Sequence, residues 1–134
     1  MYHLLQISLF QHCRDILSPE NINIVCLFDN ALRKIKGIRI IERDYQKVAP
    51  FNYTILAKKR NNLMYFLQNS GIATGINYIP NHLQPIFKSK VAKFPNTEYL
   101  YRYIISLPIY AGMKIKDTDY VISRIRKFYN KKVK

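Results

Sequence analysis

The stretch GIATGINYIPNHLQPIF, residues 71–87, joins a helix stop, a strand-like run and a loop stiffened by two prolines. Gly71 is suited to end a helix because glycine adopts left-handed backbone angles at little cost. Residues 72–78 then alternate in polarity, as a strand with one buried face does. The loop that follows is rich in hydrogen-bonding side chains: Tyr78, Asn81, His82 and Gln84. Loops held by a rigid scaffold carry binding residues more often than other segments, so this loop is the candidate site.

The residues before this stretch predict two further strands and a helix. Residues 38–41 are β-branched and residues 51–56 alternate, so both segments are candidate strands. A helix is expected over residues 58–70, where Leu63, Phe66 and Leu67 fall on one face. Together with the run at 72–78, these segments form a strand–helix–strand unit.

The residues after the loop predict two further helices with a strand between them. Asn96 is a candidate N-cap for a helix that carries Leu100, Tyr103 and Ile104 on its apolar face. Residues 105–108 resemble a short strand that ends at a proline. Asp117 is expected to cap the final helix, whose apolar positions repeat at helical spacing: Val121, Ile122, Ile125 and Phe128.

Residues 1–36 predict a helical arm, interrupted near Pro19 and closed by Gly37. Its apolar positions are Leu4, Leu5, Leu9, Phe10, Ile22, Val25, Phe28, Leu32 and Ile35. The first four need a cover, which indicates packing against something larger. We therefore expect an α+β fold: a small, mostly antiparallel sheet with about three helices on one face, preceded by the N-terminal helical arm. The expected units are the arm, 1–36, and an α+β small domain with a basic C-terminal helix, 37–134.

Length and composition set further bounds. A chain of 134 residues is long enough for one hydrophobic core. It has no apolar run long enough to span a bilayer. The apolar N-terminus lacks the basic region and cleavage site of a signal peptide, so we expect a cytoplasmic protein. The net charge of +14 raises the alternative of a module that binds nucleic acid or another polyanion.

Few residues suggest catalysis or metal binding by this chain alone. Cys13 and Cys26 have no metal-ligand spacing, and each is expected to be a reduced, buried thiol. The acidic residues are scattered, and no nucleophile–histidine–acid set is apparent. His82 is the one histidine in a polar loop. It suits either a structural role in the loop or a site residue, and Tyr78 suits either packing or binding.

In this stretch and its flanks the sequence resembles the DegT/StrS-type nucleotide-sugar aminotransferases, which are pyridoxal-phosphate (PLP) enzymes of the aspartate-aminotransferase superfamily. The loop stretch itself resembles the signature of their small domain. Arg60, Leu63, Leu67 and Gly71-Ile72 resemble the family's R-x-x-L-x-x-x-L-x-x-x-G-I helix. The segments FPNTE (94–98) and SLP (106–108) resemble its later motifs. Residues 31–38 resemble the end of its inter-domain helix, and Asp119 to Val121 with Ile125 resembles its final helix.

The resemblance implies that the chain is the C-terminal small domain of such an enzyme. The lysine, the acid and the phosphate cup that hold PLP belong to the family's large domain, so no catalytic, cofactor-binding or metal residue is expected here. Tyr78, His82 and Gln84 match the family and are expected to lie near the substrate. Asn77 stands where family members often have histidine, and no role is implied for it.

The function implied by this resemblance is that of a truncated PLP-dependent aminotransferase of keto-sugar nucleotides, for polysaccharide biosynthesis. Alone, the chain is not expected to be active or to bind PLP covalently. The expected partners are a nucleotide-sugar substrate and either a complementing large domain or a second copy of the chain. The alternative that the charge leaves open is the basic, nucleic-acid-binding module.

Overall fold

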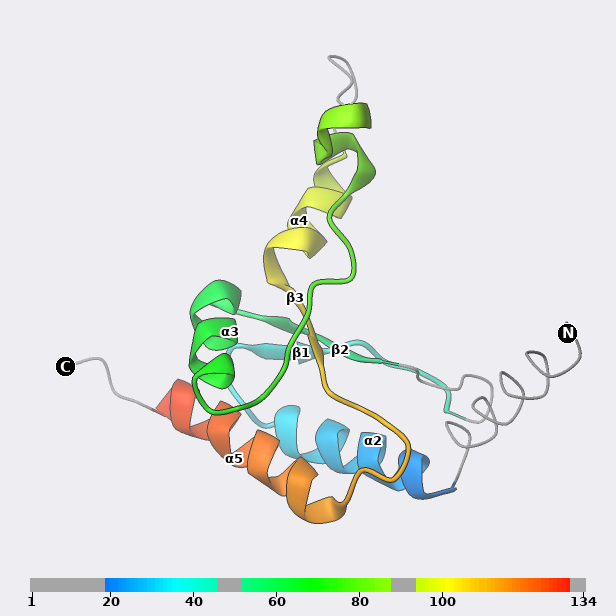
Figure 1. Ribbon diagram of the computed structural model, residues 1–134, viewed down its shortest axis with the longest axis vertical. Coiled ribbons are helices and arrows are strands. Elements are labelled where there is room, and N and C mark those ends of the chain that lie inside the picture. Colours follow the sequence, from blue (N-terminus) through cyan, green and yellow to red (C-terminus); the bar gives the residue numbers. More distant parts are fainter. Residues whose placement is uncertain (1–18, 46–51, 88–93, 131–134) are drawn as a thin grey trace, which may run out of the picture.

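The computed structural model describes residues 19–45, 52–87 and 94–130 (Figure 1). In these ranges the elements follow one another as α2 (Pro19–Leu32), β1 (Ile38–Ile40), β2 (Tyr53–Ala57), α3 (Arg60–Gln68), α4 (Pro95–Tyr103), β3 (Ile104–Leu107) and α5 (Ile115–Asn130), with the 3-10 turns η1 (Asn81–Leu83) and η2 (Pro85–Phe87) between α3 and α4. The predicted first helix of the arm, with Leu4 to Phe10 and Cys13, lies outside the described residues. None of the helices in these ranges is sufficiently long and apolar to cross a membrane.

The three strands form an antiparallel sheet in the order β1-β2-β3. β2 is central and all of its residues are buried. Its register pairs Ile55 with Ile40 on one side and with Ile105 on the other. The predicted small antiparallel sheet is therefore confirmed.

A fourth strand predicted over residues 72–78 is wrong, because only Gly75 pairs, through two backbone hydrogen bonds of 3.1 and 2.8 Å with Ser106 of β3. The neighbouring groups on that edge of β3 explain why the ladder stops. The carbonyl of Ile104 already accepts a hydrogen bond from the Arg60 guanidinium at 3.0 Å. On the other side of Ser106 the next outward position is Pro108, which has no N–H to donate.

Three helices cover one face of this sheet, as predicted, and they are α2, α3 and α5 (Figure 1). The core residues with no exposed surface come from all three helices and from the inner face of the sheet: Val25, Phe28, Leu32, Ile55, Ala57, Leu63, Leu67, Ile105 and Ile125. α2 thus takes the place that the sequence assigned to the helix near residue 100. The boundary at residue 36 between an arm and a small domain stays a prediction.

A buried cluster ties α2 to the sheet. The Asp29 carboxylate accepts hydrogen bonds from the hydroxyls of Tyr45 and Tyr53, and the Phe28 and Tyr53 rings stack with centroids 4.8 Å apart. Burial, with the neighbouring Asp29 carboxylate, raises the pKa of both tyrosines. Cys26 was expected to be buried, but it is a free, exposed thiol of α2.

The helix starts differ from the predicted caps. α4 begins at Pro95 with Phe94 in the N-cap position, so the Asn96 cap is wrong. Proline suits the first helical position because its fixed backbone angle is helical and its missing N–H has no partner there anyway. In α5, the Asp117 carboxylate lies in the first turn and accepts a hydrogen bond from the Lys114 N–H at 3.4 Å. Asp117 therefore caps the helix from inside its first turn.

Candidate functional site

The candidate loop starts from a turn that α5 holds in place. Ser70 lies in this turn, and its hydroxyl accepts hydrogen bonds from Arg124 Nε at 3.1 Å and from Nη2 at 2.9 Å. The Tyr120 hydroxyl donates to the Ser70 carbonyl at 3.0 Å. Gly71 then takes a φ of 75°, which explains why glycine stands there. The clamp made by Ser70, Tyr120 and Arg124 fixes the direction in which the chain leaves α3.

Beyond Gly75 the chain leaves the sheet and packs along α4. The Asn77–Tyr78 peptide bond is cis. Pro80 is buried, and η1 and η2 follow it. The loop, η1, η2 and α4 project together from one end of the sheet, away from α2 and α5 (Figure 1). We call residues 78–87 and 94–103 the projection.

His82 attaches the loop to α4. Its side chain is only 14% exposed, and its Nε2 lies 3.3 Å from Oε1 of Glu98. The two atoms are not aligned as a hydrogen bond, so the contact is a close approach of the two polar groups. The imidazole also packs on the Phe94 ring, with centroids 4.8 Å apart. His82 therefore has a structural role in the loop, whatever else it contacts.

The other two predicted site residues are placed differently from His82. Tyr78 is 79% exposed. The Gln84 amide donates to the Ile79 carbonyl at 3.4 Å, a long bond within the loop itself. The three residues thus lie on one loop, and among the described residues His82 is the one with a partner in another element.

Large apolar side chains of the projection lie open to solvent. Ile86 is 82% exposed and Phe87 is 57% exposed. The other apolar side chains exposed by more than two fifths of their area belong to Tyr78, Ile79, Leu83, Phe94, Tyr99 and Leu100. Neither 3-10 turn contains a buried residue, and α4 contains none either. A surface this apolar is typical of an interface rather than of a free face.

Arg60 supports the projection at its base and has no role in the sequence-based site. It is 7% exposed, donates to the Ile104 carbonyl at 3.0 Å and lies 5.5 Å from the centroid of the Tyr101 ring. Burial lowers the pKa of its guanidinium. Because Ile104 is the residue where α4 becomes β3, Arg60 fixes the angle at which α4 leaves the sheet. Its position in the R-x-x-L motif is the sequence feature that could have identified Arg60 as a functional residue.

Loop residues 71–87 contain no acidic side chain and no arginine. They also contain no lysine to bind the cofactor. The one acid beside the loop, Glu98, is already paired with His82. Within the described ranges no three His, Cys, Asp or Glu side chains gather where they could hold a metal ion. The chemistry that the loop offers is hydrogen bonding and apolar contact.

One family profile and several known proteins match this chain. Residues 13–126 match the profile of the DegT/DnrJ/EryC1/StrS aminotransferase family. A pleiotropic regulatory protein of Geobacillus stearothermophilus is 41% identical over 81 residues, which are 58% of this chain and 22% of that protein. The spore coat polysaccharide biosynthesis protein SpsC of Bacillus subtilis is 37% identical over 59 residues, 41% of this chain and 15% of that protein.

A solved structure extends the similarity to the fold. The crystal structure of a DegT DnrJ EryC1 StrS aminotransferase from Brucella abortus superposes with a TM-score of 0.76 and 26% sequence identity. The match covers 96% of this chain and 34% of that one, so the chain spans about a third of that family structure. On the profile match and this superposition, the chain belongs to the DegT/DnrJ/EryC1/StrS aminotransferase family.

Proposed function

We propose that this chain forms the substrate-side wall of a PLP-dependent aminotransferase that acts on keto-sugar nucleotides in polysaccharide biosynthesis. Membership of the family supports the reaction class, and the similarity to a spore coat polysaccharide biosynthesis protein of Bacillus subtilis supports the pathway class. The cytoplasm is the proposed compartment. The observation that carries the proposal is the exposed apolar surface of the projection, where Ile86 is 82% and Phe87 57% exposed. An ordered but exposed apolar surface of this kind fits a small domain whose large domain lies outside these residues.

The proposed contacts to substrate come from the loop. Tyr78 projects freely and offers a hydroxyl that donates or accepts. His82 keeps the loop against α4, and through that contact sets where Tyr78 stands. Gln84 has only a long internal bond, which a substrate hydroxyl would replace at little cost. All three roles are proposals for binding and positioning, not for proton transfer at the reacting carbon.

PLP supplies the electron sink for amino transfer in this family when it is bound. The lysine and the cofactor-binding groups are proposed to lie in a complementing large domain outside the 134 residues. The chain alone is therefore expected not to bind the cofactor covalently. The partner would cover the apolar side chains of the projection.

The first test is a titration of the purified chain with PLP, followed by borohydride reduction and mass analysis. We expect the absorbance of free PLP and no stoichiometric mass increase on one lysine. A single lysine that carries one PLP per chain would contradict the proposal that the cofactor site lies elsewhere.

The second test is complementation. The cofactor-binding part of the Bacillus subtilis relative, produced without its segment that matches this chain, is mixed with the chain, PLP, glutamate and a keto-sugar nucleotide. Amino-sugar formation is expected only in the mixture. Tyr78→Phe is expected to raise KM, whereas the matched control Tyr65→Phe, an exposed tyrosine of α3, is not. Equal activity without this chain, or equal effects of the two variants on KM, would contradict the proposal that this loop contacts the substrate.

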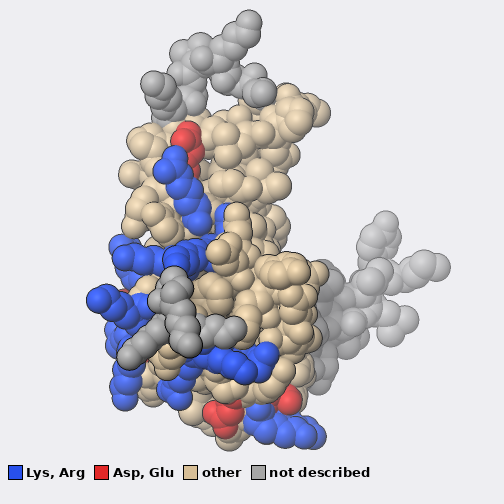
Figure 2. All heavy atoms as spheres, turned by 90° about the vertical axis from the view of Figure 1, so that its left-hand side faces the viewer, with Lys and Arg blue, Asp and Glu red and all other residues tan. Residues whose placement is uncertain are grey.

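A second candidate function rests on charge. Figure 2 shows Lys and Arg side chains gathered on the face that carries the C-terminal end of α5, with few acidic groups among them. A polyanion on this face would release counterions, so its affinity would fall steeply with salt. Binding of a generic oligonucleotide at two salt concentrations, with heparin as competitor, tests it. If the oligonucleotide binds only weakly at moderate salt, and no more tightly than heparin does, the nucleic-acid-binding module loses its support.

A further inference from the structure

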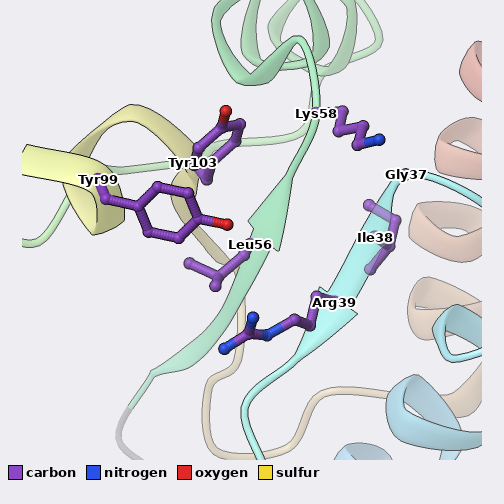
Figure 3. Close-up of a pocket in the computed structure, with 7 residues that line it drawn as sticks. All are labelled: Gly37, Ile38, Arg39, Leu56, Lys58, Tyr99 and Tyr103. Atoms are coloured by element: carbon purple, nitrogen blue, oxygen red, sulfur yellow. The ribbon is translucent and has the colours of Figure 1, made fainter. Parts of the chain in front are cut away.

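A hollow of about 210 Å³ lies on the outer face of the sheet, on the side away from the core (Figure 3). Leu56 of β2 and Arg39 of β1 line it on the side of the strands. Tyr99 and Tyr103 of α4 form the opposite wall. Among the described residues that line it, none belongs to the loop at 71–87, so the hollow is distinct from the substrate site proposed above.

One cation faces the hollow. Arg39 pairs with Leu56 across β1 and β2, so the two side chains share the outer face of the sheet. Arg39 is exposed, and within the described ranges its guanidinium has neither an acidic partner nor a hydrogen bond. Lys58 also lines the hollow, but Figure 3 shows its ammonium directed away, so it adds no second charge. None of the described lining residues is acidic, so nothing there repels an anion.

Tyr99 adds a second donor on the other wall. Tyr99 and Tyr103 are one helical turn apart on α4, and their rings pack with centroids 4.9 Å apart, so Tyr103 supports the Tyr99 ring. Figure 3 shows the Tyr99 hydroxyl directed toward the strands, with Leu56 beside it and the Arg39 guanidinium on the same side of the hollow. A hydroxyl and a guanidinium therefore flank an apolar side chain.

The charge and polarity of these groups limit what can bind. A single guanidinium balances one negative charge, and its planar fork matches the two oxygens of a carboxylate. A neutral apolar molecule would take water from the guanidinium without replacing its hydrogen bonds, which is unfavourable. Leu56 is only 6% exposed and, with the tyrosine rings, offers apolar contact to the rest of a ligand. The groups together suit a molecule with one acid group and an apolar body.

We propose that this hollow binds a small apolar monocarboxylate, with its carboxylate on the Arg39 guanidinium and the Tyr99 hydroxyl and its apolar body over Leu56. The volume, about 210 Å³, is below the roughly 300–1,000 Å³ of pockets that enclose drug-sized ligands, so an acid with a single ring fits. Tyr99 is 51% exposed, and its ring is free to stack on a flat ligand. The site needs neither PLP nor a sugar nucleotide and is separate from the aminotransferase role.

The test is an NMR titration of the full chain at low salt with benzoate, benzamide and glutamate. Benzamide has the shape of benzoate without its charge, whereas glutamate has carboxylates but no apolar body. We expect saturable amide shifts at residues 39, 56 and 99 with benzoate, binding of benzamide at least about fivefold weaker, and no shifts at these positions with glutamate. Equal binding of benzoate and benzamide, glutamate shifts at these residues, or benzoate shifts confined to other segments would overturn the proposal.

Variants separate this site from the general positive charge of the chain. Arg39→Gln is expected to weaken benzoate binding about tenfold, because it removes the charge-assisted hydrogen bonds. Tyr99→Phe keeps the ring but loses the hydroxyl, so a loss of about threefold is expected. The matched controls are Arg126→Gln in α5 and Tyr65→Phe in α3, both exposed and outside the hollow.

All four substitutions are at surface positions, so the circular dichroism spectrum and the urea midpoint should stay unchanged and confirm that each variant is folded. The controls should bind benzoate as the unmodified chain does. If Arg126→Gln loses as much affinity as Arg39→Gln, the binding is non-specific and the proposal fails. It also fails if Arg39→Gln leaves the affinity for benzoate unchanged.

Discussion

The core and the projection both contain many large apolar side chains, but those of the core are buried and most of those of the projection are exposed. Phe28, Leu63 and Ile125 have no exposed surface. In the projection, Ile86 is 82% and Phe87 57% exposed. The core obtains its stability from contacts within the chain, whereas the projection depends on a few polar contacts at its base. The difference fits the proposal that a partner covers the projection, whereas the core needs no such cover.

The largest effect expected from this comparison is on core stability. Phe28→Ala should lower the free energy of unfolding by about 3–5 kcal/mol, because it leaves a cavity beside Tyr53. Phe87→Ala, the matched change in the projection, should cost less than about 0.5 kcal/mol. Urea unfolding followed by circular dichroism measures both. Similar losses for the two variants would show that the projection is part of the same cooperative core.

The next effect concerns Gly37, where the core meets β1. Gly37 has φ of 106°, and a Cβ there would lie 2.9 Å from the Tyr129 ring. Gly37→Ala should therefore destabilise the chain by about 2–3 kcal/mol. Gly112→Ala is the control, because Gly112 also has a positive φ, 77°, but open space around it. Its cost should be the backbone strain alone, about 1 kcal/mol. Equal costs would mean that the Tyr129 ring moves aside freely.

A smaller effect is expected at high pH. Burial raises the pKa of Tyr129 from 10.0 to about 12, and its hydroxyl donates to the Lys58 carbonyl. The folded chain thus keeps a proton that the unfolded chain loses, so this stabilisation is complete below pH 10 and declines as pH rises toward 12. Tyr129→Phe should reduce the fall in urea midpoint between pH 9 and pH 11.5. An unchanged fall would assign the pH dependence to Tyr45 and Tyr53 instead.

The smallest effect on global stability is expected at His82. His82→Ala removes the contacts with Glu98 and Phe94, so amide exchange in residues 78–87 should speed up severalfold. The unfolding free energy should change by less than about 1 kcal/mol. Gln84→Ala, which loses only a long bond inside the loop, is the control. Global destabilisation by His82→Ala would show that the projection and the core unfold together.

The sequence predicted the core well because burial there follows simple periods. Val25, Phe28 and Leu32 recur at helical spacing, and all are fully buried. The alternation over residues 51–56 likewise marked the central strand, which the structure has at Tyr53–Ala57. Such periods report which face of an element is buried. They do not report which other element covers that face. For this reason the sequence assigned α4 to the face of the sheet, where the structure has α2.

The candidate site was less predictable because it depends on contacts between distant residues. The strand expected over 72–78 stops at Gly75 since Arg60 occupies the carbonyl of Ile104, a contact across 44 positions. The Ser70–Arg124 contact and the pairing of Arg39 with Leu56 are equally invisible to local patterns. Resemblance identified the loop and its residues, but the residues that hold the loop came only from the structure.

The clamp on Ser70 has a consequence for the order of events during synthesis. Arg124 and Tyr120 are made long after Ser70, which is 54 positions before Arg124. While those later residues are still inside the ribosome, the turn at Gly71 lacks the hydrogen bonds from Tyr120 and Arg124. The loop can therefore take up its final position only when translation is almost complete, and a premature stop before α5 would leave it misdirected.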